Sequence, residues 1–379
     1  MKLTDFQRIV LMNTILGIGT GLIGIFIPIY LLELGFSLKI VITWLIVHHS
    51  SLLLGAFLAI FISNTIGLVR VWYIRLALIT IFFAGLHFLP TYPFLLFILG
   101  IISGLESAFF WIPYNILTIR KTSSNNIGSS LALISNIGSI VGMAIPLIAA
   151  LVITKFGYNI LFALSLLFII ISIIPVIPLS HEKTNFEFKR KSVSDIVRNN
   201  KHFILPEIFD NLGQDAGIIW LLFIFITGLT VLDLGILGVI SSIVGILVTH
   251  LTGHLIDKWH TNKVIRFGAI LTTLTWTASY FIAIYSPTPL MLYIITTLRG
   301  LSIGIFSMSY ISVMFNRARN YDAQFIVLRE IPTILGRILV FSLSIILISL
   351  NKFELTFIIV ALLSLYFWFN NLQILSEKK

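Results

Sequence analysis

Residues 253–266 read Gly-His-Leu-Ile-Asp-Lys-Trp-His-Thr-Asn-Lys-Val-Ile-Arg, a short charged stretch between two long apolar runs. The run before it, 235–251, contains no Lys, Arg, Asp or Glu, and neither does the run after it, 268–284. A connection this short leaves no room for a domain. Because a helix needs about 20 apolar residues to cross a bilayer, the stretch is predicted to turn the chain around at a membrane surface.

The composition of the whole chain also indicates a membrane protein. The 379 residues are 58% hydrophobic and 11% charged, whereas a soluble chain is roughly a quarter charged. Long apolar runs separated by short polar gaps are typical of helices rather than of barrel strands. The first run begins at Ile9 and is long enough to span, so we interpret it as a retained helix and not a signal peptide. The absence of cysteine excludes disulfides and thiolate chemistry.

Hydrophobic length predicts twelve membrane spans, which fall six and six around the longest polar segment. The predicted fold class is therefore an all-α integral membrane protein with two pseudo-symmetric six-helix halves, residues 1–179 and 203–379, joined by a cytoplasmic linker, 180–202. The linker either lies on the membrane surface or is simply solvated. The predicted spans are 9–32, 39–63, 71–89, 93–118, 126–153, 157–178, 204–229, 234–256, 264–284, 289–314, 323–349 and 354–372.

The lysines and arginines predict the orientation. They gather in the N-terminus, the C-terminus and the even-numbered gaps, while the opposite gaps carry only Lys39, Lys155 and Lys352. Positive residues favour the cytoplasmic side, so both termini are expected in the cytoplasm and the protein in the cytoplasmic membrane. The net charge of +10 is thereby explained by topology, and no nucleic-acid partner is expected.

A weak internal repeat supports the division into halves. Residues 99–114 and 299–314 align without gaps, and the alignment pairs Gly104 with Gly304 and Ser107 with Ser307. Two repeats around a linker are typical of transporters that hold substrate between their halves.

Three features together resemble the major facilitator superfamily. The first is the six-plus-six layout. The second is the loop quoted above, in which Gly253, Asp257, Lys258 and Lys263 match the motif between the second and third helices of a half. The third is the spacing Gly138, Gly142 and Pro146 in the fifth span, which resembles a motif common among exporters. Small residues every four positions let helices approach closely, and the proline supplies a bend.

The resemblance implies alternating access, a gating role for the loop and helix packing for the fifth-span motif. Asp257 is then expected near the N-terminal end of the eleventh span. The chain departs from the family pattern in two places. The first-half loop, 63–70, lacks the acidic residue, and Ile145 precedes the proline where a glycine is usual. These departures leave the subfamily unassigned.

Charged residues within predicted spans are candidate functional residues, because an ionisable group inside a bilayer is costly. Glu106 lies near the middle of the fourth span and is a candidate for proton coupling or substrate binding; the alternative is a structural partner of an arginine. Arg337 lies in the eleventh span with Glu330 on the same face. Arg299, in the tenth, is expected to pair with a carboxylate such as Glu106 or to meet an anionic substrate.

The seventh span opens with several acids and amides. Asp210 and Gln214 are expected to line an aqueous vestibule, and Asp215 is the strongest coupling candidate of the group. For Glu207 we favour a simpler role as an acid near a helix N-terminus. His48 and His49 receive low weight, because buried histidines more often bond a carbonyl. A further set, the candidate cavity aromatics, comprises Phe110, Trp111, Tyr114, Trp220 and Tyr310; aromatics also pack or form interfacial belts.

These patterns predict a secondary active transporter that works by rocking of its halves, with the proton as coupling ion and export as the favoured direction. A lipid or amphiphile flippase on the same fold and a proton-coupled importer remain alternatives. No nucleophile–base constellation, metal cluster or phosphate loop is visible, so we expect no enzyme, no cofactor and no metal. The expected partners are a small or amphipathic substrate and membrane lipids, and the expected state is a monomer.

Overall fold

The computed structural model describes residues 3–121, 143–179, 182–183, 190–259, 261–285 and 287–369. Of these, residues 190–193, 249–251, 253–259, 261, 308 and 311–323 are described by their backbone alone. Within the described ranges the regular structure is entirely helical, which confirms the predicted all-α class. Ten of the described helical stretches are long and apolar enough to cross a membrane, and two shorter apolar ones, Ile145–Phe156 and Leu355–Phe369, fall on the fifth and twelfth predicted spans. The chain is a multi-pass membrane protein.

The helices of the N-terminal half (residues 1–179) follow the predicted spans closely. The first span is divided into two helices near Gly24, four residues before Pro28, because proline cannot donate the hydrogen bond that the Gly24 carbonyl would accept. The helices are α1 (Asp5–Ile23), α2 (Phe26–Glu33), α3 (Leu38–Ile66), α4 (Leu68–Phe88), α5 (Leu95–Lys121), α7 (Ile145–Phe156), α8 (Tyr158–Ser172) and the 3-10 helix η1 (Ile174–Leu179).

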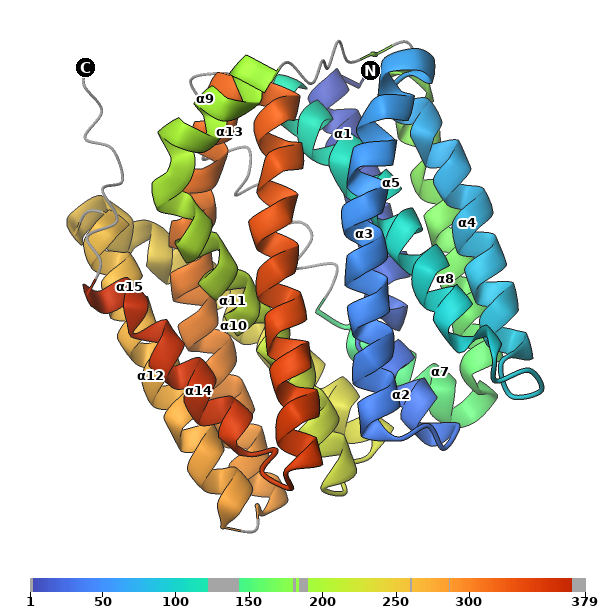
Figure 1. Ribbon diagram of the computed structural model, residues 1–379. Helices are drawn as coiled ribbons and strands as arrows, with labels where there is room; N and C mark the ends of the chain where they lie inside the picture. The colour runs from blue at the N-terminus through green and yellow to red at the C-terminus, as the bar shows by residue number, and fades with distance from the viewer. Residues whose placement is uncertain are drawn as a thin grey trace.

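The C-terminal half (residues 203–379) follows a linker helix, α9 (Arg190–Asn200), and a short 3-10 helix, η2 (Lys201–Phe203). Its helices are α10 (Ile204–Ile226), α11 (Val231–Trp259), α12 (Thr261–Ile284), α13 (Pro289–Ser349), α14 (Leu355–Ser364) and α15 (Tyr366–Phe369). The start of α1 and the linker helix α9 lie at the same end of the molecule (Figure 1).

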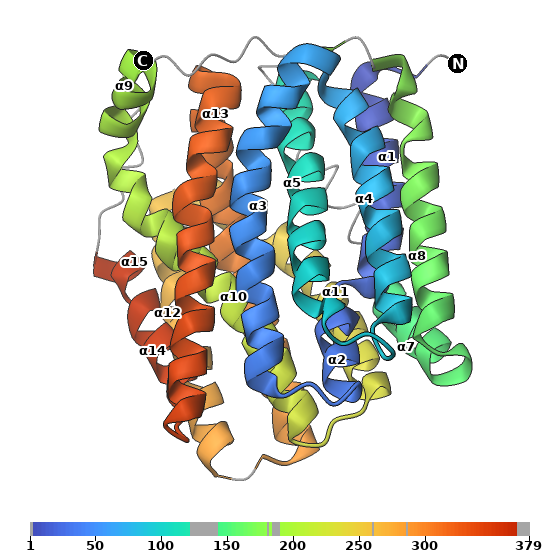
Figure 2. The same ribbon diagram turned by 45° about the vertical axis from the view of Figure 1, so that its right-hand side comes forward.

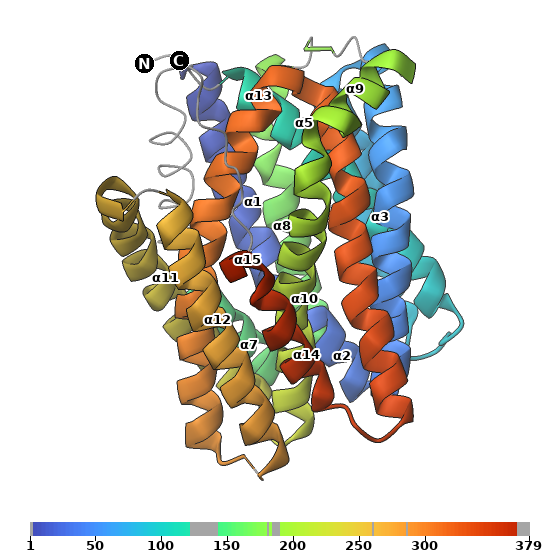
Figure 3. The same cartoon turned by 60° about the vertical axis from the view of Figure 1, so that its left-hand side comes forward.

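Helix α13 differs from the prediction of two separate helices. Its backbone is helical from Pro289 to Ser349 and contains two apolar stretches of membrane length, Pro289–Ser307 and Gln324–Ser349. The polar gap predicted between them, 315–322, contains neither glycine nor proline, and its backbone is helical, so the gap is not an open loop. The ribbon turns back between the two stretches, which form separate limbs of the bundle (Figure 3).

The helices of each half pack chiefly on one another, and two pairs of helices make the most extensive contacts between the halves. Helix α3 lies against α13, as Figure 2 shows, and α7 packs against α11. At the second junction a Cβ atom on Gly238 would lie 2.4 Å from the Pro146 Cβ, and one on Gly235 would lie 2.6 Å from the Ala150 Cβ. The absence of side chains at these two glycines therefore allows α11 to approach α7.

The glycines paired by the internal repeat occupy corresponding contacts. A Cβ atom on Gly104 would lie 2.1 Å from the His48 carbonyl oxygen of α3, and one on Gly304 would lie 2.8 Å from Val248 of α11. In each half, then, a glycine lets the fourth span of that half meet the second.

Candidate functional site

The N-terminal half contains a cavity of about 450 Å³. Its walls come from α1, α2, α3, α4 and α5, and Ile218 of α10 closes one side. Most of the lining is apolar or aromatic, and the polar lining includes Asn13, His48, His49, Arg75, Glu106 and Ser107. A cavity with apolar walls and a few polar groups is the usual form of a small-molecule site.

An ion pair between Arg75 of α4 and Glu106 of α5 forms part of the cavity wall. The Arg75 Nε donates to Glu106 Oε2 at 3.0 Å, and the Ser107 hydroxyl donates to Glu106 Oε1 at 3.1 Å. The guanidinium also lies 4.6 Å from the centre of the Phe110 ring. Both charged side chains are buried, 4% and 8% exposed, and a buried charge of either sign is tolerated when it is paired in this way.

This pairing matches the alternative given for Glu106, a partner of an arginine, but the arginine is Arg75 and not Arg299. Arg75 is buried inside α4, so it does not belong with the exposed cations that predict the orientation. The sequence did carry a signal, since Arg75 lies inside the third predicted span and an arginine there requires a partner.

Two adjacent histidines of α3 line the same cavity in different ways. His48 Nδ1 lies 2.8 Å from the Ser103 hydroxyl, within the N-terminal half. His49 faces the other half: its Nε2 lies 3.1 Å from Asp215 Oδ2 of α10, and its ring stacks on Phe341 of α13. His49 therefore contacts a carboxylate of the other half and not a backbone carbonyl, as the expectation for buried histidines had it.

Asp215 connects His49 to a cation of the C-terminal half. Arg337 Nε lies 3.8 Å from the same Asp215 oxygen, and the Arg337 guanidinium donates to Asn211 Oδ1 at 3.3 Å and 3.4 Å. This cluster, which we call the inter-half bridge (His49, Asp215, Arg337 and Asn211), joins α3 to α10 and α13. A proton on His49 makes its contact with Asp215 an ion pair.

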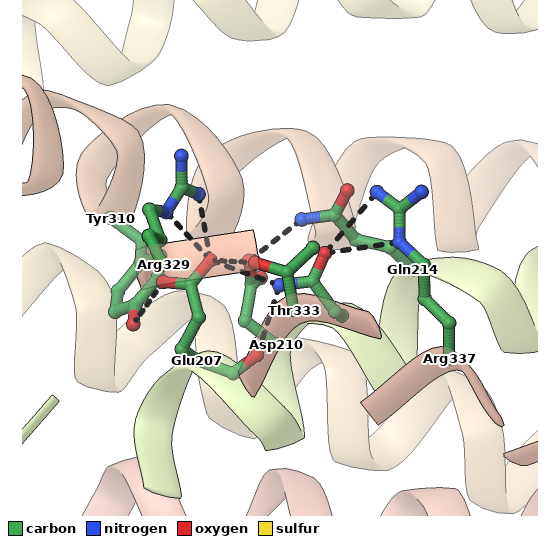
Figure 4. Close-up of polar contacts among 8 residues, drawn as sticks. Glu207, Asp210, Gln214, Tyr310, Arg329, Thr333 and Arg337 are labelled. Atoms are coloured by element: carbon green, nitrogen blue, oxygen red, sulfur yellow. Dashed lines mark hydrogen bonds and ion pairs between the residues drawn. The ribbon is translucent and has the colours of Figure 1, made fainter. Parts of the chain in front are cut away.

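Glu207 lies at the centre of a second buried cluster, between α10 and α13 (Figure 4). Its Oε1 lies 2.7 Å from an Arg329 guanidinium nitrogen and accepts from Thr333 at 3.0 Å and Asn211 at 3.1 Å, while Oε2 accepts from Tyr310 at 3.1 Å. The side chain is 1% exposed. Glu207 does lie in the first turn of α10, as expected of an acid near a helix N-terminus, but it also has partners on α13 that this role did not include. Glu207 and Arg329 are 122 residues apart in the chain, so the sequence alone does not reveal their contact.

The remaining polar candidates lie near this cluster. Asp210 is buried and accepts a hydrogen bond from the side chain of Gln214, at 2.7 Å, which is itself exposed (Figure 4). Glu330 is half-buried on α13. Arg329, on the same helix, is paired with Glu207.

Arg299 has no carboxylate partner among the described residues, so the expected ion pair is wrong. Its guanidinium carbon lies 3.5 Å from the centre of the Trp276 ring and 5.1 Å from that of Trp220. Aromatic rings attract a cation through their negative faces. The two tryptophans thus take the place of the carboxylate.

The five candidate aromatics divide between the cavity and the core. Phe110 and Trp111 line the cavity. Tyr114, Trp220 and Tyr310 are buried and do not line it: Tyr114 stacks on Phe110, Trp220 donates to Thr296, and Tyr310 donates to Glu207. Their assignment to the cavity was wrong because sequence alone does not separate the cavity face of a helix from its packing face.

The two family motifs are only partly described. Gly138 and Gly142 lie outside the described residues, whereas Pro146 contacts α11 as given above. Gly253, Asp257 and Lys258 are described by backbone alone, as part of α11, and Lys263 is exposed near the start of α12. The gating role of the loop stays a prediction. Within the described residues, no three His, Cys, Asp or Glu side chains group as a metal centre would require.

Comparison with known proteins places this arrangement in a family. The sequence pattern of the Major Facilitator Superfamily matches residues 9–319. The chain is 23% identical over 279 residues to the uncharacterized protein YqgE of Bacillus subtilis (strain 168), an alignment that covers 68% of this chain and 62% of that protein's length.

Two similar solved structures are crystal structures of a bacterial homologue of the iron transporter ferroportin in its outward-facing state. One has a TM-score of 0.70, and the other, with soaked iron, has a TM-score of 0.67; each is 16% identical and covers 96% of this chain and 98% of that one. At this identity the likeness concerns the fold alone. The match over residues 9–319 and the shared fold confirm the resemblance found in the sequence: the chain belongs to the Major Facilitator Superfamily, a family of membrane transporters.

Proposed function

We propose that this transporter is a proton-coupled antiporter that moves a small amphipathic molecule out of the cytoplasm. The observation that supports this most is the buried Arg75–Glu106 pair in the wall of the 450 Å³ cavity. In this proposal Glu106 carries the coupling proton, and the cavity is where a substrate would sit. Proton and substrate would therefore act on the same pair.

The Arg75–Glu106 pair offers a way to couple proton binding to substrate binding. When Glu106 takes up a proton it loses its charge, and Arg75 keeps only its contact with the Phe110 ring. A substrate with a polar group would compete with Glu106 for Arg75, so the free carboxylate and the bound substrate exclude each other at the guanidinium. Two ligands that affect one site in this way must affect each other's affinity reciprocally, which is the thermodynamic requirement of coupled transport.

The inter-half bridge is the proposed route by which this change reaches the other half. His49 lines the same cavity as Glu106 and lies 3.1 Å from Asp215 in the C-terminal half. Loss of this contact would remove a polar link between α3 and α10. The halves would then be free to separate on this side, as alternating access by rocking requires.

The walls of the cavity suggest the substrate class. Trp44, Phe82, Phe110 and Trp111 give it aromatic surface, beside the polar groups named above. Aromatic walls favour an apolar or aromatic body, and the Arg75–Glu106 pair favours a polar group at one end. An amphipathic molecule satisfies both.

Transport into proteoliposomes tests the proposal. Vesicles with an acidic interior and a clamped membrane potential are given external ethidium, an amphipathic aromatic probe, and both probe uptake and proton release are followed. The native chain is expected to accumulate the probe while releasing protons. Glu106→Gln should abolish gradient-driven uptake, and Asp195→Asn, on the exposed linker helix, should not. Proton-driven uptake at the native rate in Glu106→Gln would refute the coupling role, and uptake favoured by an acidic exterior would indicate an importer.

The orientation of the chain is part of the same proposal. With both termini in the cytoplasm, Lys155 at the end of α7 faces the outside of the cytoplasmic membrane. The chain has no native cysteine, so Lys155→Cys provides a single label site, and an impermeant maleimide is expected to label it in intact cells. Labelling only after the cells are opened would show that the chain has the opposite orientation.

A further inference from the structure

A second, much smaller cavity lies inside the C-terminal half. It measures about 20 Å³ and is bordered by α10, α12, α13, α14 and α15. That volume accommodates a single particle of the size of a water molecule. Phe209, Phe306 and Phe367 form its apolar walls, and the oxygen-bearing side chains that line it are Asp210, Gln214, Thr272, Ser307 and Ser364.

Three of these side chains leave buried oxygen atoms without a partner. Asp210 Oδ1, Thr272 Oγ1 and Ser307 Oγ make no hydrogen bond in the described part of the chain. The hydroxyls are unusual in this respect, since those of Thr273 and Ser309, on the same two helices, donate to carbonyls four residues earlier. Buried polar atoms are nearly always satisfied, so three unsatisfied oxygens around one small cavity indicate that a ligand completes them.

The charge of the site indicates the sign of that ligand. Among the described residues, the other fully buried acids each have a cationic or imidazole partner: Glu106 has Arg75, Glu207 has Arg329, and Asp215 has His49 and Arg337. Asp210 is equally buried, 4% exposed, and has none. Its Oδ2 accepts from Gln214, which leaves Oδ1 as the free acceptor.

We propose that this cavity is a binding site for one dehydrated monovalent cation, and that the cation is Na⁺. One carboxylate and neutral hydroxyl oxygens match a single positive charge and the oxygen ligands that hard cations prefer. Mg²⁺ keeps several waters when bound, and a cavity of this size has no room for them. Gln214 is exposed and hydrogen-bonded to Asp210, so it marks the side from which the ion enters.

The stability of the purified full-length protein tests the site, because a ligand that binds only the folded state raises Tm. Unfolding is followed as NaCl replaces choline chloride at constant ionic strength and constant pH, and the titration is repeated at a second pH. For the native protein Tm is expected to rise with Na⁺ and to saturate. Asp210→Asn should remove the response, and Thr272→Val, which loses one ligand and keeps its shape, should weaken sodium binding about tenfold.

Asp233→Asn is the matched control, because Asp233 lies in the same half but bonds Thr230 and Tyr293 away from the cavity. It should keep the sodium response in full. The proposal is overturned if Na⁺ and choline give the same Tm in the native protein, or if Asp210→Asn retains the response. A Tm that depends on pH through Asp210 but not on Na⁺ would identify a protonated acid with a bound water and would equally overturn it.

This inference stands apart from the proposed antiport. The sodium test measures equilibrium binding, without a gradient or a transported probe. If proton-driven uptake fails, the sodium site is unaffected. If the sodium site fails, the Arg75–Glu106 mechanism is unaffected.

Discussion

Glu207 illustrates how a single buried charge organises the C-terminal half. Its two carboxylate oxygens accept from Arg329, Thr333, Tyr310 and Asn211. Such an arrangement adds little net stability over an apolar core, but the loss of one charged partner is costly because the other charge stays buried and unpaired. The cluster therefore fixes how α10 meets α13.

The first prediction follows from this asymmetry. Glu207→Gln leaves Arg329 without its counter-charge and is expected to lower the free energy of unfolding by about 3–5 kcal/mol. Thermal unfolding of the purified protein measures the change. Asp195→Asn, which removes an exposed i,i+3 pair with Arg198, should change it by less than about 0.5 kcal/mol. Equal effects of the two substitutions would contradict the assigned role of Glu207.

The candidate residues were easier to predict than their partners. Depth within a predicted span singled out Glu106, Asp215 and Arg337, and each of them is buried or half-buried within a helix. Depth alone does not reveal which helices are neighbours. The sequence therefore did not predict Arg75 as the partner of Glu106, or His49 as the partner of Asp215. For Arg299 it predicted a carboxylate, whereas the side chain lies against Trp276 and Trp220.

At the scale of the helix, close approach of α3 and α5 depends on Gly104. A Cβ atom there would lie 2.1 Å from the His48 carbonyl oxygen and 2.8 Å from the Leu52 nitrogen, both of them backbone atoms that cannot rotate away. Gly17 of α1 lies on the cavity and has no atom within 4 Å of the corresponding position. The same substitution should thus have opposite effects at the two glycines.

We expect Gly104→Ala to destabilise the protein by about 1–3 kcal/mol through overpacking. Gly17→Ala should leave stability unchanged or raise it by up to about 1 kcal/mol, because alanine favours the helix. The midpoints of thermal unfolding of the two variants compare them directly. If Gly104→Ala proves as stable as Gly17→Ala, the close contact between α3 and α5 is not as described.

Most elements follow from the sequence because a bilayer sets both the length and the polarity of a span. The exceptions have local causes. The first span is divided near Gly24 by the missing amide of Pro28, and the backbone of α13 continues through a polar gap that lacks a helix-breaking residue. Hydropathy locates spans, but it does not show where a helix bends or continues beyond the membrane.

At the scale of the whole molecule, the halves meet chiefly through α3 with α13 and α7 with α11, and α5 also packs against α13. The second junction depends on Gly235 and Gly238, which lie against Ala150 and Pro146. Interfaces that separate during transport must be stable yet reversible, and a glycine contact without interlocking side chains suits that requirement.

Gly238→Ala is expected to weaken this junction, since the added methyl would lie 2.4 Å from Pro146 Cβ. Ala150→Cys, buried at the junction, reports its opening through the rate of maleimide labelling. That rate should rise in the Gly238→Ala background. Gly245→Ala, also on α11 but with no atom within 4 Å of its Cβ position, should leave it unchanged. A labelling rate that responds equally to both would show that the junction does not depend on Gly238.

The central claim is that Glu106 carries the coupling proton at the cavity. The most direct measurement compares two activities of one variant in proteoliposomes: exchange of labelled for unlabelled ethidium without a pH gradient, and accumulation of ethidium against its own gradient when the interior is acidic. Glu106→Gln is expected to keep exchange, because the cavity and the rocking motion are intact, and to lose accumulation. A Glu106→Gln protein that still accumulates the probe under the proton gradient would contradict the claim.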